Sequence, residues 1–289
     1  MEDLALFENP ESGFVFNVNN SAYHGSVYEE NLNPKDFNSN MGYNEKVNNR
    51  SARVYELLEK YPGNIDWNDF LDIKFDHTYP KDTFYFMRDF SIMELYQIDT
   101  VENPDLADAV RQINAFDGTT DSLERNFGVL MFALYEIYDR SEGRAEELEN
   151  DKEARLKLFT DCVRLAKNHM IKHFGTIDMA YKDIYVLERG GKTVPVNGGP
   201  GNIRSAFAKK MDDGSGRMRI WIGDSFVQLV RFTKDGPEIY SASPFGATNR
   251  PERKHYNDQM ELYSKQQFKK MSLEKQYWLD RAEEIYSPE

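Results

Sequence analysis

The sequence predicts a protein of the α+β class, and three observations lead to that prediction. The chain has 289 residues, of which 40% are hydrophobic and 13% aromatic, which is enough to build a sizeable core. Its middle part carries apolar residues at helical spacing. From Gly175 onward, short apolar runs alternate with glycine-rich turns, which is typical of antiparallel strands.

The first helix is predicted to begin near Asn48, with Val54, Leu57 and Leu58 on its apolar face. Four more helical segments are expected before residue 140. The first is a short helix that starts at 66–69, with Phe70, Ile73 and Phe75 facing inward. The next two are expected over residues 83–97 and over residues 105–116, after Pro104. The fourth is capped by Asp121 and Ser122 and runs to about Tyr138.

The segment before the first helix reads as one strand and one long loop. Residues 13–18 (Gly-Phe-Val-Phe-Asn-Val) are predicted to form a buried strand that ends in an asparagine-rich turn. Residues 22–46 are polar, with scattered Gly, Asn, Pro and Tyr, and predict a long loop.

The second half of the chain begins with a charged segment. Residues 144–173 contain no Gly or Pro and carry charges of alternating sign, so we expect a charged helical insertion over 140–173, exposed to solvent rather than part of the core. A C-terminal β-meander is then predicted, with strands at 184–187, 217–222, 226–232 and 238–242. A last helix is predicted at about 272–285.

Charge and cysteine content exclude several classes of function. The chain has 36 Lys and Arg against 49 Asp and Glu, so its net charge is 36 − 49 = −13. Such an excess of acid argues against nucleic-acid or anionic-membrane partners, which need clustered cations. No run approaches 18 apolar residues, so no membrane span is predicted, and residues 1–4 do not resemble a signal peptide. A single cysteine, Cys162, excludes an internal disulfide.

Gly223-Asp224-Ser225 follows an apolar run and is the first candidate site. A serine exposed after a strand, with His255 as its base, would suit an esterase of the Gly-Asp-Ser type. Only 64 residues follow this motif, and the Asp-x-x-His of such esterases is missing. A tight hairpin turn is the preferred interpretation.

Two further motifs are interpreted as structural. His169 and His173 lie one turn apart, but Cys162 would be about 16 Å away along the helix, at ~1.5 Å per residue, too far to share a metal ion with them. A partly buried helix face explains all three residues. The glycine-rich segment 197–202 lacks the Gly-Lys-Ser/Thr of a phosphate-binding loop and contains a proline, so it is predicted to be a structural loop.

The segment Asn17-Val18-Asn19-Asn20-Ser21 is the last candidate. Asparagine amides donate hydrogen bonds without titrating, which suits them to holding an oxyanion. From spacing alone, however, a β-turn remains the preferred interpretation.

This asparagine-rich segment resembles the strand-end Asn-x-Asn-Asn/Ser-Ser/Thr motif of the penicillin acylase and acyl-homoserine lactone acylase family. The resemblance continues in the same order along the chain, from about residue 12 to 270. Its further parts are Asn49-Arg50-Ser51-Ala52-Arg53 before Leu57-Leu58, Phe116-Asp117-Gly118 with Asp121-Ser122, Gly198-Gly199-Pro200, Gly223-Asp224-Ser225, and His255-Tyr256-Asn257-Asp258-Gln259. Residues 140–172 match nothing in the family pattern.

The resemblance implies the αββα sandwich of the N-terminal-nucleophile hydrolases, in which a precursor cleaves itself into α and β chains. The serine at the new β N-terminus attacks an amide, with its own α-amine as base, and forms an acyl-enzyme. Asn19 matches the asparagine that holds the oxyanion. Arg50 matches the arginine that orients the site, and at a helix start it could brace Asn19 by hydrogen bonds.

The resemblance also implies what the chain lacks. The nucleophile serine would lie upstream, so residues 1–289 are expected to be the C-terminal portion of one β-subunit domain. The expected partners are the α subunit, the N-terminal part of the β subunit and an acylated small molecule. No cofactor is needed for the chemistry. The parent protein is expected to be periplasmic or secreted, with a structural calcium for which Glu30 is the nearest counterpart here.

Three interpretations therefore stay open. The first is a fragment of an amide hydrolase that contributes Asn19 and Arg50 to the site. The second is a non-catalytic remnant or scaffold of the same fold. The third is an esterase that uses Ser225.

Overall fold

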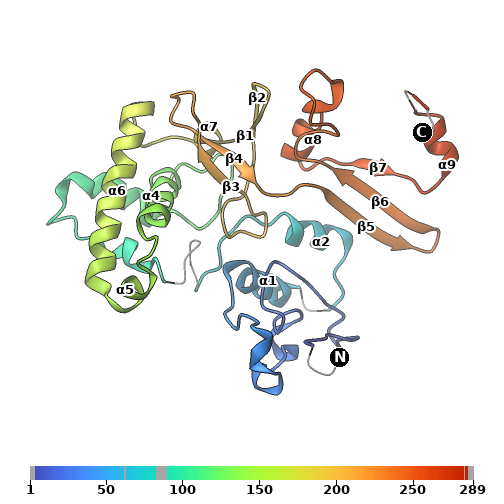
Figure 1. Cartoon of the computed structure of the whole chain (residues 1–289), viewed down its shortest axis with the longest axis horizontal. Coiled ribbons are helices and arrows are strands. Elements are labelled where there is room, and N and C mark those ends of the chain that lie inside the picture. Colours follow the sequence, from blue (N-terminus) through green and yellow to red (C-terminus); the bar gives the residue numbers. More distant parts are fainter. Residues whose placement is uncertain (1–3, 62, 83–89, 283, 286–289) are drawn as a thin grey trace. The chain divides into compact units, whose positions relative to one another are not determined.

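The computed structural model describes residues 4–61, 63–82, 90–282, 284 and 285 (Figure 1). The chain divides into two compact units, Met1–Val186 with Pro195–Gly223 and Leu187–Val194 with Asp224–Glu289. We call them unit 1 and unit 2. Both contain helices and strands, which confirms the predicted α+β class.

The first two helices of unit 1 begin where the sequence predicts. Helix α1 (Asn49–Lys60) starts after Asn48, whose side chain accepts a hydrogen bond from the Ser51 N–H. The Ser51 hydroxyl in turn accepts a hydrogen bond from the Asn48 N–H. Helix α2 (Trp67–Lys74) has the same reciprocal cap with Asp66. These caps satisfy N–H groups that no helical carbonyl can reach. Phe70 of α2, expected to face inward, is instead 39% exposed.

The polar stretch 22–46 is confirmed as a long loop, and it carries three short 3₁₀ turns, η1 (Tyr28–Glu30), η2 (Pro34–Asp36) and η3 (Ser39–Met41). Part of the helix predicted over 83–97 lies outside the described residues. The rest of it contains only the 3₁₀ turn η4 (Met93–Gln97). The helix expected over 105–116 is present as η5 (Pro104–Leu106) followed by α3 (Ala107–Ala115).

Helices α4 (Gly128–Arg140) and α6 (Lys152–Phe174) form the core of unit 1. A Cβ on Gly128 would lie 2.9 Å from the end of the Met170 side chain, so a larger residue there would require this side chain to shift. The helix begins six residues later than Asp121 and Ser122, which do not cap it. Residues 122 and 124 instead use their carbonyls to accept hydrogen bonds from the N–H groups of 182 and 181.

The charged segment 140–173 is not a solvent-exposed element, and that part of the prediction is wrong. It forms α5 (Ala145–Asn150), a break at Asp151, and α6. Six residues of α6 are buried: Leu158, Phe159, Cys162, Val163, Ala166 and Met170. The charged residues of α6 lie on its other faces. The alternation of charge along the sequence therefore did not reveal that one face is apolar and buried.

A small sheet of four strands joins distant parts of the chain. Strand β1 (Tyr185–Arg189), which follows the short helix α7 (Tyr181–Ile184), pairs in parallel with β4 (Met218–Ile222). Strand β3 (Phe207–Lys210) pairs antiparallel with β4. The strand β2 (Lys192–Pro195) follows β1 after a turn at Gly190 and Gly191. The parallel pair was not expected from a meander.

In unit 2, β5 (Val227–Thr233), β6 (Gly236–Ala242) and β7 (Lys269–Met271) form an antiparallel meander, as predicted. Strands β4 and β5 belong to different sheets, so residues 223–225 link two sheets and are not the predicted hairpin turn. Unit 2 also contains η6 (Lys254–Tyr256), α8 (Met260–Ser264) and α9 (Lys275–Leu279), and α9 is shorter than the predicted 272–285.

Residues 13–18 are extended but form no strand, so the prediction of a buried strand is wrong. Exposure alternates along them as in a strand with one covered face, and Val15 is 66% exposed. The segment has one hydrogen bond of the ladder type, from the Phe16 N–H to the Gly25 carbonyl at 2.8 Å. A strand is a property of a pair of segments, and no described residue supplies the neighbour.

No helix among the described residues combines the length and the apolar character needed to cross a bilayer. The longest one, α6, has 23 residues and carries charges along its length.

Cys162 offers a direct test of how α6 packs. The thiol is buried, and burial raises its pKa to about 12. At pH 8 roughly one thiol in 10⁴ would then be ionised, and the thiolate is the reactive form. We expect no reaction with Ellman's reagent in native buffer and one equivalent of release after denaturation in guanidinium. Rapid labelling of the native chain would show that α6 is not packed as described.

Candidate active site

Asn19 and the start of helix α1 lie together. Asn19 adopts a left-handed backbone conformation, with φ of 56°, which asparagine tolerates better than most residues. Its N–H donates to Asn17 Oδ1 at 2.9 Å, which closes the turn. Asn48 Nδ2 donates to the Asn19 carbonyl at 2.9 Å, while Asn48 Oδ1 caps α1. One asparagine therefore fixes both the helix start and the turn.

The side chain of Asn19 is oriented by Arg50. Arg50 Nη1 donates to Asn19 Oδ1 over 2.9 Å, so the predicted hydrogen bond is present. A guanidinium can only donate, so the amide oxygen must face it and the NH₂ group must face away. Asn19 Nδ2 makes no hydrogen bond with any residue that the structure describes. The arrangement presents a free amide donor next to a cation.

Arg50 is half-buried and, within the described ranges, forms no ion pair with a carboxylate. Burial lowers the pKa of its guanidinium, but arginine remains charged near neutral pH. An uncompensated cation bonded to the amide oxygen polarises the amide and makes its N–H groups better donors. This is the electrostatic property that an oxyanion site requires.

Asn20, the next residue, has a different task. Its Oδ1 accepts from the Val18 N–H at 2.7 Å, and its Nδ2 donates to the carbonyls of Ser21 and His24. Both ends of this amide serve the turn. Asn20 is therefore a matched control for Asn19.

Glu30 connects the start of the extended segment, at Ser12, to Ser26. Its carboxylate accepts from the Ser12 N–H at 2.8 Å and from the Ser12 hydroxyl at 2.5 Å, and Ser26 Oγ lies 2.5 Å from it. Ser26 is fully buried and also lies 2.8 Å from the Phe14 carbonyl. These hydrogen bonds, with those of Ser12 first, hold the pKa of Glu30 below its usual range.

This cluster does not fit the calcium site expected by resemblance. Calcium in proteins takes about six to eight oxygen ligands, usually with several carboxylates. The Glu30 oxygens are already occupied by hydrogen-bond donors. No group of three or more His, Cys, Asp or Glu side chains is placed to hold a metal ion anywhere in the described residues. Glu30 is better explained as a brace for the segment that carries Asn19.

A pocket of about 1100 Å³ opens beside Asn19 and Arg50. Its lining is rich in amides, with six asparagines, and its walls come from four places in unit 1. These are the segment 17–22 with Asn17, Asn19, Asn20 and Ser21, the segment 42–50 with Lys46 and Arg50, helix α5 with Ala145 and Glu149, and the positions Gly201 and Phe207. The contribution of α5 could not be predicted from the sequence, because nothing local in a charged helix indicates that it lines a pocket with residues about a hundred positions away.

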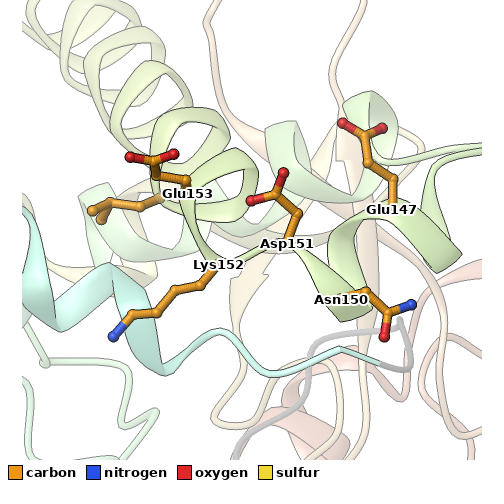
Figure 2. A pocket seen from close by; sticks show the side chains of 6 residues that line it. Glu147, Asn150, Asp151, Lys152 and Glu153 are labelled. Atoms are coloured by element: carbon orange, nitrogen blue, oxygen red, sulfur yellow. The ribbon is translucent and has the colours of Figure 1, made fainter.

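A second hollow, of about 680 Å³, lies where α5 meets α6. Figure 2 shows the carboxylates of Glu147, Asp151 and Glu153 on one side of this junction and the Lys152 side chain pointing away from them. Glu147 pairs with Arg144, and Asp151 caps α6 by accepting from the Ala154 N–H. These contacts explain the acidic residues as parts of the helix ends.

The remaining candidate motifs are structural. His169 Nε2 lies 2.8 Å from the Gly216 carbonyl, and burial lowers its pKa, so a partly buried helix face is confirmed. In the glycine-rich segment, Tyr181 and Tyr79 donate to the carbonyls of Gly198 and Pro200. A Cβ on Gly198, whose φ is 105°, would lie 2.2 Å from the Arg204 carbonyl, so this structural loop requires glycine.

Ser225 lacks the base that the esterase interpretation assigned to it. Ser225 is exposed and makes no hydrogen bond with His255 or with any other described residue. His255 Nδ1 lies 2.6 Å from Asp258 Oδ2. Asp224 accepts from the Tyr263 hydroxyl at 3.1 Å. The motif links two sheets and shows no activated nucleophile.

Nearly the whole chain matches one family of acylases, which are hydrolases that cleave amides. A sequence model of the penicillin amidase family matches residues 1–278. The chain therefore belongs to the penicillin amidase family, which confirms the resemblance drawn from the motifs.

Individual relatives match over shorter stretches. The acyl-homoserine lactone acylase PvdQ of Pseudomonas syringae pv. syringae (strain B728a) is 31% identical over 105 residues, which are 36% of this chain and 14% of that protein. PvdQ of Pseudomonas syringae pv. tomato is 32% identical over 89 residues, 30% of this chain and 12% of that protein. The matched stretches thus span a small part of the length of these relatives.

Among solved structures, the thermostable penicillin G acylase from Alcaligenes faecalis matches with a TM-score of 0.39 and 12% identity, covering 86% of this chain and 54% of that chain. The family assignment rests on the sequence match.

The role of Glu30 as a brace predicts a measurable titration. Because its folded pKa is lowered, ionised Glu30 stabilises the segment above its unfolded pKa, and this contribution is lost as pH falls through the folded pKa. We expect the Ser12 amide proton, followed by NMR, to shift with a midpoint below the usual glutamate range. The Glu30→Gln variant should abolish this titration. An unchanged Ser12 titration in that variant would contradict the brace.

Proposed function

We propose that the parent protein of this chain hydrolyses N-acyl amides and that Asn19 donates a hydrogen bond to the oxyanion. The observation that carries the proposal is the 2.9 Å hydrogen bond from Arg50 Nη1 to Asn19 Oδ1, which leaves Nδ2 of this pocket-lining residue without a protein acceptor among the described residues. Membership of the penicillin amidase family supports the reaction class.

The chemistry follows from the geometry. When a nucleophile attacks an amide carbonyl, negative charge develops on the carbonyl oxygen. A donor that is already aimed at that position stabilises the transition state without reorganising. Asn19 is held by its backbone through Asn48 and by its side chain through Arg50, so its donor is preorganised. Arg50 acts through Asn19 and is a positioning residue in this proposal.

The nucleophile belongs to the same proposal and is assigned to polypeptide outside these 289 residues. Among the described residues that line the pocket, Ser21 is the only serine. Ser21 is 6% exposed, and its Oγ accepts from the Tyr23 N–H at 3.2 Å, with no base bonded to it within the described ranges. An N-terminal serine with its own α-amine as base would supply both missing groups.

The partners in this proposal are the α subunit and the N-terminal part of the β subunit. The short spans matched in the PvdQ proteins, 14% and 12% of their length, are compatible with a chain that provides part of a larger enzyme. The substrate is an acylated small molecule, and PvdQ by its name acts on acyl-homoserine lactones. A periplasmic or secreted location of the parent protein, as the resemblance implies, is also part of the proposal.

The second candidate is a non-catalytic remnant or scaffold of the same fold. The preorganised Asn19 favours the enzyme, because a scaffold has no need of an amide donor aimed into a pocket. The esterase is disfavoured because Ser225 has no hydrogen-bonded base among the described residues.

The chain of 289 residues by itself is expected to have no acylase activity. Without a serine activated by a base, no acyl-enzyme can form. Purified chain would be incubated with long-chain acyl-homoserine lactones and release of fatty acid measured. Turnover that survives Ser225→Ala would contradict the missing nucleophile, and turnover abolished by that change would favour the esterase.

In the parent enzyme, Asn19→Ala is expected to lower kcat by about 10²–10³ with little change in KM, because the lost donor acts only on the developing oxyanion. Arg50→Lys should lower kcat less, since lysine keeps the charge but not the planar guanidinium that orients the amide. Steady-state kinetics on N-acyl substrates would measure both, after verifying that precursor cleavage still occurs.

The matched control is Asn20→Ala, which removes a neighbouring amide that serves the turn. It should affect thermal stability more than kcat. An equal loss of kcat in the Asn19 and Asn20 variants would mean that the turn as a whole, and not the Asn19 donor, matters.

A further inference from the structure

Helix α5 forms one wall of the pocket beside Asn19. Ala145 and Glu149, four residues apart on one face of the helix, line the pocket. This helix lies in the charged segment 140–172, which carries none of the motifs on which the family resemblance was based.

The position of α5 is fixed by groups that do not face the pocket. Leu148 is fully buried. Arg155 of α6 donates to the carbonyls of Leu148 and Glu149 at 2.6 and 2.9 Å. Arg155 also binds Glu94 Oε1 at 2.6 Å, and both side chains of this pair are largely buried. These contacts connect the end of α5 to α6 and to Glu94. The backbone of Glu149 is thus held by Arg155.

The Glu149 carboxylate itself has no hydrogen bond and no ion pair with any residue that the structure describes. Its neighbour Glu147 is different, because it forms two hydrogen bonds with Arg144 at 2.8 and 2.9 Å. Glu149 is the one carboxylate among the described residues that line this pocket.

The other charges of the pocket lie on a different wall. Arg50 donates to Asn19, and Lys46 belongs to the segment that leads into α1. No ion pair joins Glu149 to either cation among the described residues. The lining therefore combines cationic groups near the amide donor, an anionic group on α5 and several asparagine amides.

The lining also indicates which half of a substrate fits. The asparagine amides and the charged groups of the lining can pair with polar groups of a substrate, which an apolar acyl chain does not offer. With the scissile carbonyl at Asn19, this pocket suits the amine side of the amide. This step rests on the proposed function.

We propose that Glu149 selects substrates whose amine portion carries a second, positively charged group, an ammonium or a guanidinium. A carboxylate at the far wall would pair with that group while the carbonyl lies at Asn19. The net charge of −13 favours the approach of cations to the chain as a whole. A neutral amine portion such as a lactone would leave Glu149 without a partner.

The test compares two ligands that differ by one ammonium group, N-butanoyl-L-lysinamide and N-butanoyl-L-norleucinamide. Binding to the chain of 289 residues would be followed by NMR titration at low ionic strength. We expect the lysine ligand to bind about twofold to fivefold more tightly, as for a solvent-accessible ion pair. High salt should reduce this preference. Equal affinities in the unmodified chain would overturn the proposal.

Variants locate the effect. Glu149→Gln should abolish the preference while leaving the affinity for the norleucine ligand unchanged, and Glu149→Lys should reverse it. Glu146→Gln removes the same charge from the same helix, but from a residue that does not line the pocket, and should keep the preference. Loss of the preference in Glu146→Gln, or its survival in Glu149→Gln, would overturn the assignment.

Kinetics of the parent enzyme on the same two compounds separate this inference from the function on which it rests. Absence of turnover on both compounds, with the binding preference intact, would contradict the proposed hydrolase but not the role of Glu149. Turnover on both with equal kcat/KM would contradict the role of Glu149 alone.

Discussion

A guanidinium has five N–H groups and no lone pair to offer, and this asymmetry determines how the site is built. Wherever Arg50 meets an amide, the oxygen must turn toward it and the nitrogen away. The 2.9 Å bond to Asn19 Oδ1 therefore does more than hold a side chain, because it selects one of two amide orientations that are nearly equal in shape. Only in this orientation does Asn19 offer an N–H donor to a ligand in the pocket that it lines.

The support behind this bond is shared with secondary structure. Asn48 uses its oxygen to cap α1 and its nitrogen to hold the Asn19 carbonyl, and Arg50 occupies the first turn of the same helix. The residues that begin α1 therefore also hold Asn19 in place. The brace from Glu30 to Ser12 and Ser26 secures the other end of the extended segment, so that both flanks of Asn19 are fixed by hydrogen bonds.

Features that depend on neighbouring residues in the sequence could be predicted. The cap at Asn48, the start of α2 after Asp66 and the strands β5 and β6 all follow from local patterns. The bond between Asn19 and Arg50 joins residues 31 positions apart and was expected from the family motifs. Spacing alone indicated a turn there and nothing more.

Features that depend on distant partners could not be predicted in the same way. Residues 14–18 have the pattern of a strand, but a strand exists only beside another one. The parallel pairing of β1 with β4 has no local signal. The apolar stripe of α6 lies among charges of alternating sign, and its packing on α4 depends on residues far apart in the sequence.

The contacts of Arg155 have a consequence for how this protein can diverge. One guanidinium connects Glu94, the end of α5 and helix α6, so the wall of the pocket is positioned by residues that no ligand would touch. Sequence drift at such supporting positions would move the wall and change what the pocket accepts, while the residues that line it stay the same. A comparison of pocket residues alone would therefore overlook differences in selectivity between related chains.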